Sequence, residues 1–406
     1  MIGTHDTRDS LVVDNIGLLV TNDPNLGDGP LGLLRDAAVV VEGGRIVAVS
    51  TNANADRMAD RRIDAGAMCV LPGFVDSHSH LVFAGDRSDE FVARMAGQPY
   101  QAGGIRTSVD ATRRATNLEL NGLTLRRRRE AFQEGITTIE IKSGYGLTPE
   151  HEARCLSIAR SFTAETTFLG AHVVPPEFEG RTDDYVHHVC NDMLAQAAPH
   201  ARWIDAFCEV GAFDADQCRA VLEAGRAVGL GLRLHANQLG YGPGVRLAVE
   251  MGCASADHCT YLTDDDIGAL AGSNTVATFL PATDFSTRQP YPNARRVIDA
   301  GATVALATNC NPGSSNSTSM GFCLALAVRD MHMTIEEAIQ AATVGGAAAL
   351  QRSDLGRLSI GSPADVLVLN APSYTHFAYR PGVPLVAHTL VGGQPAMGQS
   401  STTEAR

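Results

Sequence analysis

Residues 71–80, with the sequence LPGFVDSHSH, decide the fold of this chain. An apolar run follows a Pro-Gly turn and ends in His78-Ser79-His80. Side chains two residues apart on a strand point to the same face, so two imidazoles leave the end of one strand together. Two such side chains can reach one metal ion. A His-x-His pair also fits a purely structural role, so the interpretation depends on partners elsewhere in the chain.

Beyond this stretch, strand-like apolar runs alternate with segments of helical period. The expected strands are 74–80, 137–142, 166–172, 203–209, 231–236, 255–258, 275–280 and 303–308. The expected helices include 124–134, 149–162, 185–197, 215–228, 242–251 and 292–300. Alternation of this kind over about 250 residues predicts an α/β fold, a (β/α)8 TIM-like barrel. A run of four arginines, 126–129, is interpreted as a solvated helix face.

The two ends of the chain are β-rich instead. Val/Ile runs flank a Glu-Gly-Gly-Arg turn at 42–45, which is typical of a hairpin, and similar runs return after an Ala-rich helix at 334–350. We expect both ends to pair into one small β-sandwich. The predicted domains are therefore 1–70 (with 1–10 loose) and 356–396 for the sandwich, 71–355 for the barrel, and 397–406 as a loose tail.

Composition narrows the class of protein. The 406 residues exceed one ordinary core, and the net charge of −13 argues against a nucleic-acid partner, which would need a basic face. No basic-then-apolar leader and no apolar run of about 18 residues is apparent, so neither secretion nor a membrane role is expected. The nine cysteines include no C-x-x-C, which predicts reduced thiols in a cytoplasmic protein.

Polar residues end most of the expected strands. The carboxyl ends of barrel strands carry the chemistry of this fold, so these residues are functional candidates. They are His78, His80, Lys142, His172, Glu209, His235, His258 and Asn309. Histidine at so many strand ends favours a metal or catalytic site over scattered core histidines. Three imidazoles on a divalent ion leave a position for water, whose pKa the ion lowers toward neutrality, as a hydrolase requires.

Longer strings resemble the imidazolonepropionase family of the amidohydrolase superfamily. They are IKSGYGL (141–147), TTFLGAHVVPP (166–176), LHANQ (234–238), SADH (255–258) and NCNPGSS (309–315). The resemblance implies hydrolysis of the ring amide of 4-imidazolone-5-propanoate to N-formimidoyl-L-glutamate in histidine degradation. It also implies one zinc or iron ion per subunit, a small-molecule substrate and a homodimer.

The same resemblance implies roles for individual residues. The metal ligands would be His78, His80 and His235. Arg87 would pair with the propanoate carboxylate, unless it is a solvated loop residue. His258 would polarise the carbonyl oxygen under attack or move a proton. The substrate contacts would be Tyr145, His172, Gln238 and Ser314, and the contacts to the polar tail of the product would be Asn311 and Gly313.

Asn309 departs from the family pattern. The family string is Thr-Asp-x-Asn-Pro-Gly, in which the Asp ligates the metal and takes a proton from the attacking water. An Asn carbonyl approaches a metal only weakly, and the amide is not basic near neutral pH. Gln238 likewise stands where many relatives have Glu. Three interpretations stay open: an engineered change, another base with His258 as first candidate, or binding without turnover.

Lys142 raises a further alternative. Some superfamily members carry a carbamylated lysine that bridges two metal ions, but on strand 4, whereas Lys142 falls on strand 2. One ion is therefore expected, with Lys142 and Glu209 making structural polar contacts. Two other functions remain alongside the leading one: a hydrolase of another heterocyclic amide or imine, and a ligand-binding protein without catalysis.

Overall fold

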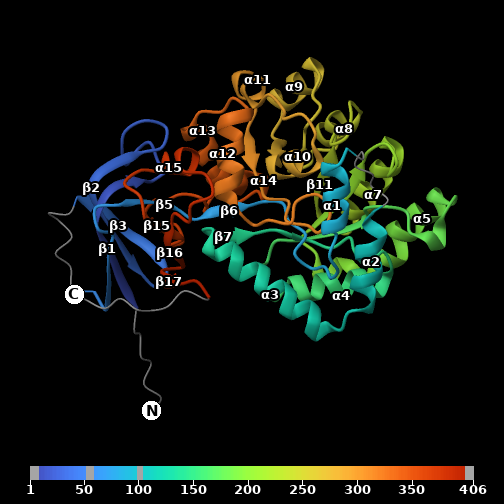
Figure 1. Cartoon of the computed structure of the whole chain (residues 1–406), viewed down its shortest axis with the longest axis horizontal. Coiled ribbons are helices and arrows are strands. Elements are labelled where there is room, and N and C mark those ends of the chain that lie inside the picture. Colours follow the sequence, from blue (N-terminus) through green and yellow to red (C-terminus); the bar gives the residue numbers. More distant parts are fainter. Residues whose placement is uncertain (1–8, 52–58, 98–103, 398–406) are drawn as a thin grey trace, which may run out of the picture.

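The computed structural model describes residues 9–51, 59–97 and 104–397. Two parts lie side by side: a mixed sheet made from both ends of the chain, and a larger part of strands and helices (Figure 1). The loose ends predicted at 1–10 and 397–406 fall almost wholly outside the described residues. Ser10 is an exception, because it begins the first strand.

The two chain ends form one sheet of eight strands. Its order is β17-β16-β15-β5-β1-β2-β3, with β4 pairing to β1. Val366 of β15 stands opposite Pro72 of β5, which joins the ends as expected. The strands are β1 (Ser10–Val20), β2 (Leu33–Glu42), β3 (Arg45–Thr51), β4 (Arg61–Asp64), β5 (Cys69–Pro72), β15 (Val366–Leu369), β16 (Val386–Val391) and β17 (Gln394–Pro395).

This end sheet is buried on both faces. Leu11, Val39 and Val366 belong to a core of its own. Leu18 and Leu71 instead join the core of the larger part. The described strands at the chain ends form a single sheet, so the β-sandwich stays a prediction.

The larger part is built on parallel strands. Seven form one sheet in the order β14-β13-β12-β11-β10-β9-β8, and β6 and β7 form a parallel pair. Only Glu140 separates β7 from β8. All eight expected strands have counterparts, an arrangement consistent with the predicted barrel. They are β6 (Phe74–Asp76), β7 (Ile136–Ile139) with β8 (Ile141–Lys142), β9 (Thr166–Ala171), β10 (Trp203–Cys208), β11 (Gly231–Ala236), β12 (Ser255–His258), β13 (Val276–Phe279) and β14 (Val304–Leu306).

Helices alternate with these strands and surround them (Figure 1). Several begin at capping boxes, such as Thr116 with Glu119 before α3 and Asp214 with Gln217 before α7. The helix expected at 185–197 contains a π-helical turn, η4. The helical elements are α1 (Ser88–Met95), α2 (Ile105–Arg114), α3 (Asn117–Gln133), α4 (Pro149–Ala159), η3 (Pro176–Phe178), α5 (Thr182–His188), η4 (Val189–Met193), α6 (Leu194–Ala197), η5 (Ala198–His200), α7 (Ala215–Ala227), α8 (Gly244–Glu250), α9 (Asp264–Ala271), α10 (Pro281–Thr287), α11 (Ala294–Asp299), α12 (Met320–Asp330), α13 (Ile335–Gln340), η6 (Ala341–Gly345), α14 (Gly346–Ala349) and α15 (His376–Tyr379).

The interpretation of residues 126–129 as a solvated face is wrong for two of the four arginines. Arg127 and Arg128 of α3 are only 6% and 4% exposed. Arg127 Nη1 donates to the carbonyls of Leu81 and Phe83 at 2.8 and 2.9 Å. Arg128 donates to two further carbonyls, at 136 and 137. Both guanidinium groups thus anchor backbone around β6 and β7.

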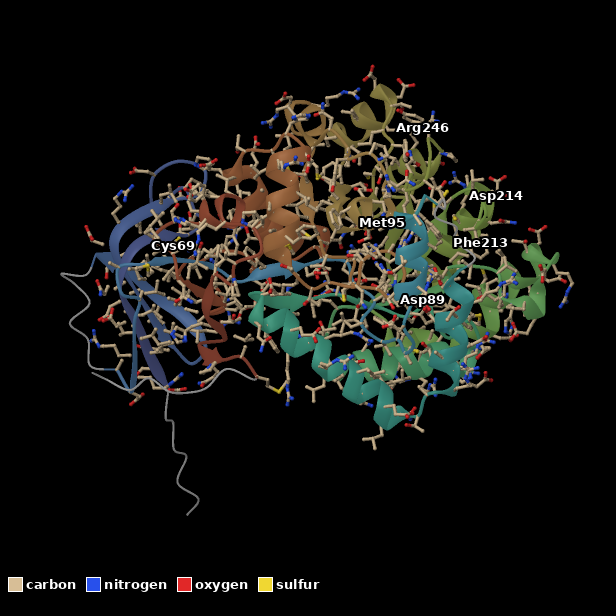
Figure 2. All side chains as sticks on the ribbon, in the orientation of Figure 1. Cys69, Asp89, Met95, Phe213, Asp214 and Arg246 are labelled. Atoms are coloured by element: carbon tan, nitrogen blue, oxygen red, sulfur yellow. The ribbon has the colours of Figure 1, made fainter. Side chains whose placement is uncertain are left out.

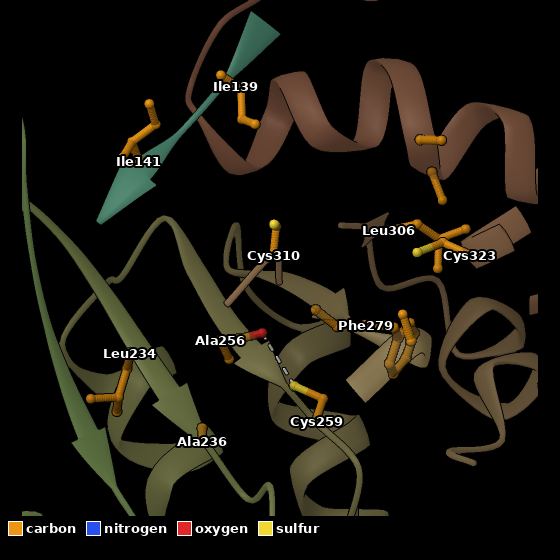
Figure 3. Packing of buried hydrophobic residues seen from close by; sticks show 14 of the residues in the cluster. Ile139, Ile141, Leu234, Ala236, Ala256, Cys259, Phe279, Leu306, Cys310 and Cys323 are labelled. Carbon is orange, nitrogen blue, oxygen red and sulfur yellow. Dashed lines mark hydrogen bonds between the residues drawn. The ribbon is translucent and has the colours of Figure 1, made fainter. Parts of the chain in front are cut away.

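The core of the larger part fills the space between neighbouring strands and the helices outside them. Figure 3 shows Leu234, Ala256, Phe279 and Leu306 from successive strands in one cluster. In Figure 2, Cys69 lies in the end sheet, whereas Met95 lies on α1 in the larger part. All nine cysteines are free thiols. Within the described residues, no helix has the length and apolar character to cross a membrane.

Candidate active site

Three histidines meet at the carboxyl ends of the strands. His78 and His80 follow β6 and His235 lies in β11, and one ligand nitrogen from each falls within 4.8 Å of the others. Backbone bonds hold the His-x-His segment in place, because Asn309 N donates to His78 O and His80 N donates to Cys310 O, both at 2.9 Å. These two bonds also connect the chain after β6 to the chain after β14.

Two carboxylates set the orientation of these imidazoles. Asp257 Oδ2 lies 2.8 Å from His78 Nδ1. Asp205 Oδ2 lies 2.9 Å from His235 Nδ1. A carboxylate on one ring nitrogen leaves the other nitrogen to a metal ion, which is the usual arrangement of a ligating histidine.

The donor set fits a metal ion. His78 Nε2 and His80 Nδ1 are buried without a hydrogen-bond partner in the described part of the chain, an arrangement that needs an explanation in a folded protein. Burial, followed by the charge of Lys142, holds the pKa of His78 well below its usual value. Burial likewise lowers the pKa of His80. Both rings are therefore neutral, which is the form that ligates a metal.

A small cavity opens above this cluster, with about 30 Å³ of space for a water-sized molecule inside it. Most residues singled out from the sequence line it, and the exceptions are His78, Lys142, Glu209 and Gly313. The lining residues are His80, Arg87, Ile105, Tyr145, His172, Val173, Phe207, His235, Gln238, His258, Asn309, Asn311 and Ser314.

Arg87 is 5% exposed, so the solvated-loop interpretation of this residue is wrong. Its Nε and Nη2 donate to the two carboxylate oxygens of Glu90 at 2.8 and 2.6 Å. The guanidinium also packs against Gly313, where an added Cβ would lie 2.2 Å from Arg87 Nη1. Glycine at 313 is therefore required for the guanidinium to reach the cavity in this orientation.

Asn311 organises the loop on which Gly313 lies. Its Oδ1 accepts the backbone N–H groups of Gly313 and Ser314, both at 2.8 Å, and its Nδ2 donates to Ser314 Oγ at 2.9 Å. The Asn311 side chain therefore supports the loop from within and places Ser314 on the cavity wall.

Aromatic rings form one wall of the cavity. His172 stacks on His80 with ring centroids 5.5 Å apart, and Tyr145 lies edge-on to His172 at 5.6 Å. His172 Nδ1 lies 2.9 Å from Gly144 O, and a carbonyl only accepts, so Nδ1 carries the proton. Burial is the main cause that lowers the pKa of His172 to about 3. The neutral ring therefore has Nε2 as an acceptor.

His258 and Asn309 both sit in left-handed backbone, with φ of 81° and 49°. Such strain in non-glycine residues is concentrated at functional sites. The His258 ring centroid lies 5.3 Å from that of His235 and 5.7 Å from that of His78. Asn309 is 2% exposed and its Oδ1 has no partner in the described residues. Both residues thus belong to the rim of the histidine cluster.

The charged residues beneath the cluster were not expected from the sequence. Asp205, Arg233 and Asp257 lie within β10, β11 and β12 with side chains fully buried. The available signal was a charged residue inside an apolar strand, since a buried charge needs a partner. Lys142 joins this group, and Glu209 accepts from the backbone of Leu239 at 2.8 Å. Both therefore make the polar contacts expected of them.

Comparisons with known proteins agree with this geometry. A profile described as the amidohydrolase family matches residues 69–396. An imidazolonepropionase of Salinispora tropica is 63% identical over 388 residues, covering 95% of this chain and 98% of the relative. One from Mycolicibacterium smegmatis is 62% identical over 385 residues, covering 95% and 97%.

Solved structures match in fold. The zinc complex of atrazine chlorohydrolase TrzN from Arthrobacter aurescens TC1 superposes with a TM-score of 0.71 at 19% identity, covering 95% of this chain and 94% of that one. A guanine deaminase from C. acetobutylicum with bound guanine gives 0.68 at 14% identity, covering 95% and 99%. At these identities the likeness supports the fold alone.

Proposed function

Because the chain belongs to the amidohydrolase family and, within it, to the imidazolonepropionases of histidine degradation, we propose that the cavity above His78, His80 and His235 is where it hydrolyses the ring amide of 4-imidazolone-5-propanoate. The product would be N-formimidoyl-L-glutamate. The observation that carries the proposal is the joint presence of three convergent imidazoles and a buried arginine, Arg87, around one cavity. A small anionic heterocycle needs both a hydrolytic centre and a cationic anchor.

The metal is assigned to the three clustered histidines, as the unpartnered nitrogens of His78 and His80 support. A zinc or iron ion held there would supply Lewis acidity, which lowers the pKa of a water ligand toward neutrality. Imidazole ligands suit both metals. Asp205 and Asp257 would keep the rings of His235 and His78 in the ligating orientation.

The other lining residues receive substrate roles. Arg87 would bind the propanoate carboxylate, with Glu90 holding the far edge of its guanidinium. His172, with its proton committed to Gly144 O, would accept from a ring N–H of the substrate. Tyr145, Gln238, Asn311 with Gly313, and Ser314 would complete the contacts. His258 would polarise the ring carbonyl or move a proton.

Asn309 supports a finer proposal, that turnover is slow. Its side chain is an amide where the family has a carboxylate, so this position supplies no base. His258 is then the first candidate for proton transfer. A second possibility follows from the same observation: a homologue that binds its ligand tightly and hardly turns over. A hydrolase of a different heterocyclic amide or imine is the alternative if the Arg87 assignment fails.

One experiment tests the proposed function directly. We would measure metal per chain and the rate of imidazolone propanoate hydrolysis for the purified protein. About one zinc or iron per chain with hydrolysis above the uncatalysed rate supports the proposal. Metal binding without any hydrolysis, in both this chain and Asn309→Asp, contradicts the catalytic assignment and favours the ligand-binding homologue.

We also propose the finer architecture. The bonds between the chain after β6 and the chain after β14 support a closed (β/α)8 barrel over 71–355. For the sandwich, the supporting contact is an isolated antiparallel bridge between Arg45 at the start of edge strand β3 and Pro363 just before β15. That contact supports a sheet folded over on itself, built from 1–70 and 356–396. A homodimer rests on the family resemblance, and a cytoplasmic location on the nine unpaired thiols.

A further inference from the structure

A cluster of five fully buried charges lies under the three histidines. It comprises Glu140, Lys142, Asp205, Arg233 and Asp257, and all five side chains have 0% exposure. Burying charge is costly unless each group is closely paired, so a cluster of this size needs a reason. None of the substrate roles proposed above uses it.

Lys142 is the centre of this cluster. Its Nζ lies 2.9 Å from Asp205 Oδ2, 3.0 Å from Glu140 Oε1 and 3.6 Å from Asp257 Oδ2. An ammonium has three donors that point in different directions, which suits three carboxylates, one from β10, one from β12 and one from the residue between β7 and β8. The planar fork of an arginine would not match that arrangement.

Two of those carboxylates also touch the histidines. Asp205 contacts His235 twice, since Oδ1 accepts the backbone N–H at 3.1 Å and Oδ2 lies 2.9 Å from Nδ1. Asp257 Oδ2 lies 2.8 Å from His78 Nδ1. Each carboxylate therefore stands between the ammonium and one imidazole.

We propose that Lys142 is a positioning residue of the metal centre, which holds the carboxylates of Asp205 and Asp257 and through them the ligand imidazoles of His235 and His78. The inference rests on the metal site of the proposed function. Lys142 is not among the residues that line the cavity, and its contacts to the site run through the two carboxylates.

Arg233 completes the arrangement from the other side. Its Nη2 lies 3.2 Å from Asp257 Oδ2 and donates to Ser77 O at 2.8 Å. The group then holds three carboxylates and two cations, a net charge of −1 beneath a cation site. Lys142 and Arg233 keep Asp257 from turning away from His78.

Because Lys142 is positively charged, a purely electrostatic role and a positioning role predict opposite changes in metal affinity. A lysine that acted only through its charge would repel a metal ion, so Lys142→Met would then bind metal more tightly. A positioning lysine predicts the opposite, because the freed carboxylates no longer hold the rings. Loss of such an orienting partner typically costs about 10–100-fold in metal affinity.

The experiment uses the full chain, stripped of metal and titrated with Zn²⁺ against a chelator. It also records the visible absorption of the Co²⁺-loaded protein, which reports ligand geometry independently of activity. We expect Lys142→Met to bind Zn²⁺ about tenfold or more weakly, with a shifted Co²⁺ spectrum. Unchanged or tighter binding with an unchanged spectrum overturns the inference.

Two further variants guard against a folding defect. Asp205→Asn keeps the volume and an acceptor oxygen but removes the charge, and we expect weaker Zn²⁺ binding here too. Lys142→Met/Asp205→Asn removes one charge of each sign, so it should fold at least as well as Lys142→Met while binding metal no better than Asp205→Asn. If both variants fold and bind Zn²⁺ as the unmodified chain does, the inference is wrong.

A matched control is Asp266→Asn, which alters a carboxylate that is 1% exposed but lies at the start of α9 with Thr263 and Arg246. Its Zn²⁺ affinity and Co²⁺ spectrum should match those of the unmodified chain. Failure of the unmodified chain to bind Zn²⁺ overturns the metal site itself. Normal binding by the chain and all variants overturns only the role of Lys142.

Discussion

The side-chain amide of Asn309 donates a hydrogen bond to the hydroxyl of Thr283, with 2.8 Å between Nδ2 and Oγ1. Thr283 follows β13, so this bond ties the ends of two neighbouring strands together beside the histidine cluster. The amide nitrogen is therefore committed to the fold, and only Oδ1 remains for the site. A carboxylate at 309 could keep the contact, because the Thr283 hydroxyl can donate as well as accept.

Replacing Asn309 with Asp should therefore raise kcat without disturbing the fold. A general base typically contributes about 10²–10⁴-fold, so we expect a gain of at least about 100-fold in hydrolysis of imidazolone propanoate. Metal content measured on both proteins is the control. An unmodified chain that is already fast, with no gain from Asp, would show that the proton goes elsewhere, and His258 would be the next residue to replace.

Arg87→Ala should raise KM far more than it lowers kcat. Hydrogen bonds to a charged group contribute about 1.5–3 kcal/mol, which is roughly 10- to 150-fold in KM. Arg87→Lys should recover only part of the loss, because an ammonium lacks the two-pronged geometry. The control is Arg106→Ala, whose side chain is 52% exposed and which should leave KM unchanged. Unchanged KM in Arg87→Ala would remove the carboxylate assignment.

Removal of the metal should lower Tm, and added Zn²⁺ should restore it. A ligand that binds only the folded state at 1,000 times its Kd stabilises it by about 4 kcal/mol. His235→Ala should abolish the response, since it removes one of the three clustered ligands. His187→Ala alters an exposed histidine and should respond as the unmodified chain does. Equal Zn²⁺ responses in both variants would place the metal elsewhere.

Arg128→Met should destabilise the protein, and Arg126→Met should not. Arg128 donates to Ile136 O at 2.9 Å and Thr137 O at 2.6 Å, so its loss leaves two buried carbonyls unpaired. Each unpaired group costs about 1–3 kcal/mol. Arg126, on the same helix, has a side chain 64% exposed, and its removal should change stability by less than about 0.5 kcal/mol. Urea unfolding of the two variants makes the comparison, and similar losses would contradict the anchoring role.

Asp284 should make stability depend on pH. Burial raises its pKa well above 3.8, although the Thr260 hydroxyl donates a hydrogen bond to the carboxylate. The folded state then binds the proton more tightly, so this contribution is complete below the unfolded pKa and is lost as pH rises through the folded pKa. Asp284→Asn should gain about 1 kcal/mol or more over the unmodified chain at pH 8, with the gain vanishing toward pH 4. A pH-independent difference in urea unfolding would contradict this assignment.

Much of the larger part of the fold could be predicted from local pattern. Most parallel strands of the larger part are apolar runs that end at a polar residue, and parallel strands bring those ends to one edge. That logic placed His78, His172 and His258 on one site without any knowledge of contacts. The strand order of the end sheet was harder to predict. Both β4 and β5 pair with β1, and local sequence does not determine which strands become neighbours.

What the sequence could not reveal were partnerships across strands. Arg127 was expected to be exposed to water because it lies in a run of charged residues, yet its acceptors are carbonyls 46 and 44 residues earlier in the chain. Asp205 and Asp257 each read as one polar residue in an apolar strand. Their role is apparent only from the structure, in which both carboxylates lie close to the ammonium group of Lys142.

Lys142 is also the one lysine in the sequence, and its side chain is completely buried. The outside of the folded protein therefore offers no lysine to reagents that acylate amines or to aldehyde crosslinkers. Any label that mass spectrometry finds on residue 142 must have arrived while the strands were apart. The rate at which an acylating reagent modifies Lys142 therefore measures how often the strands beneath the histidine cluster separate.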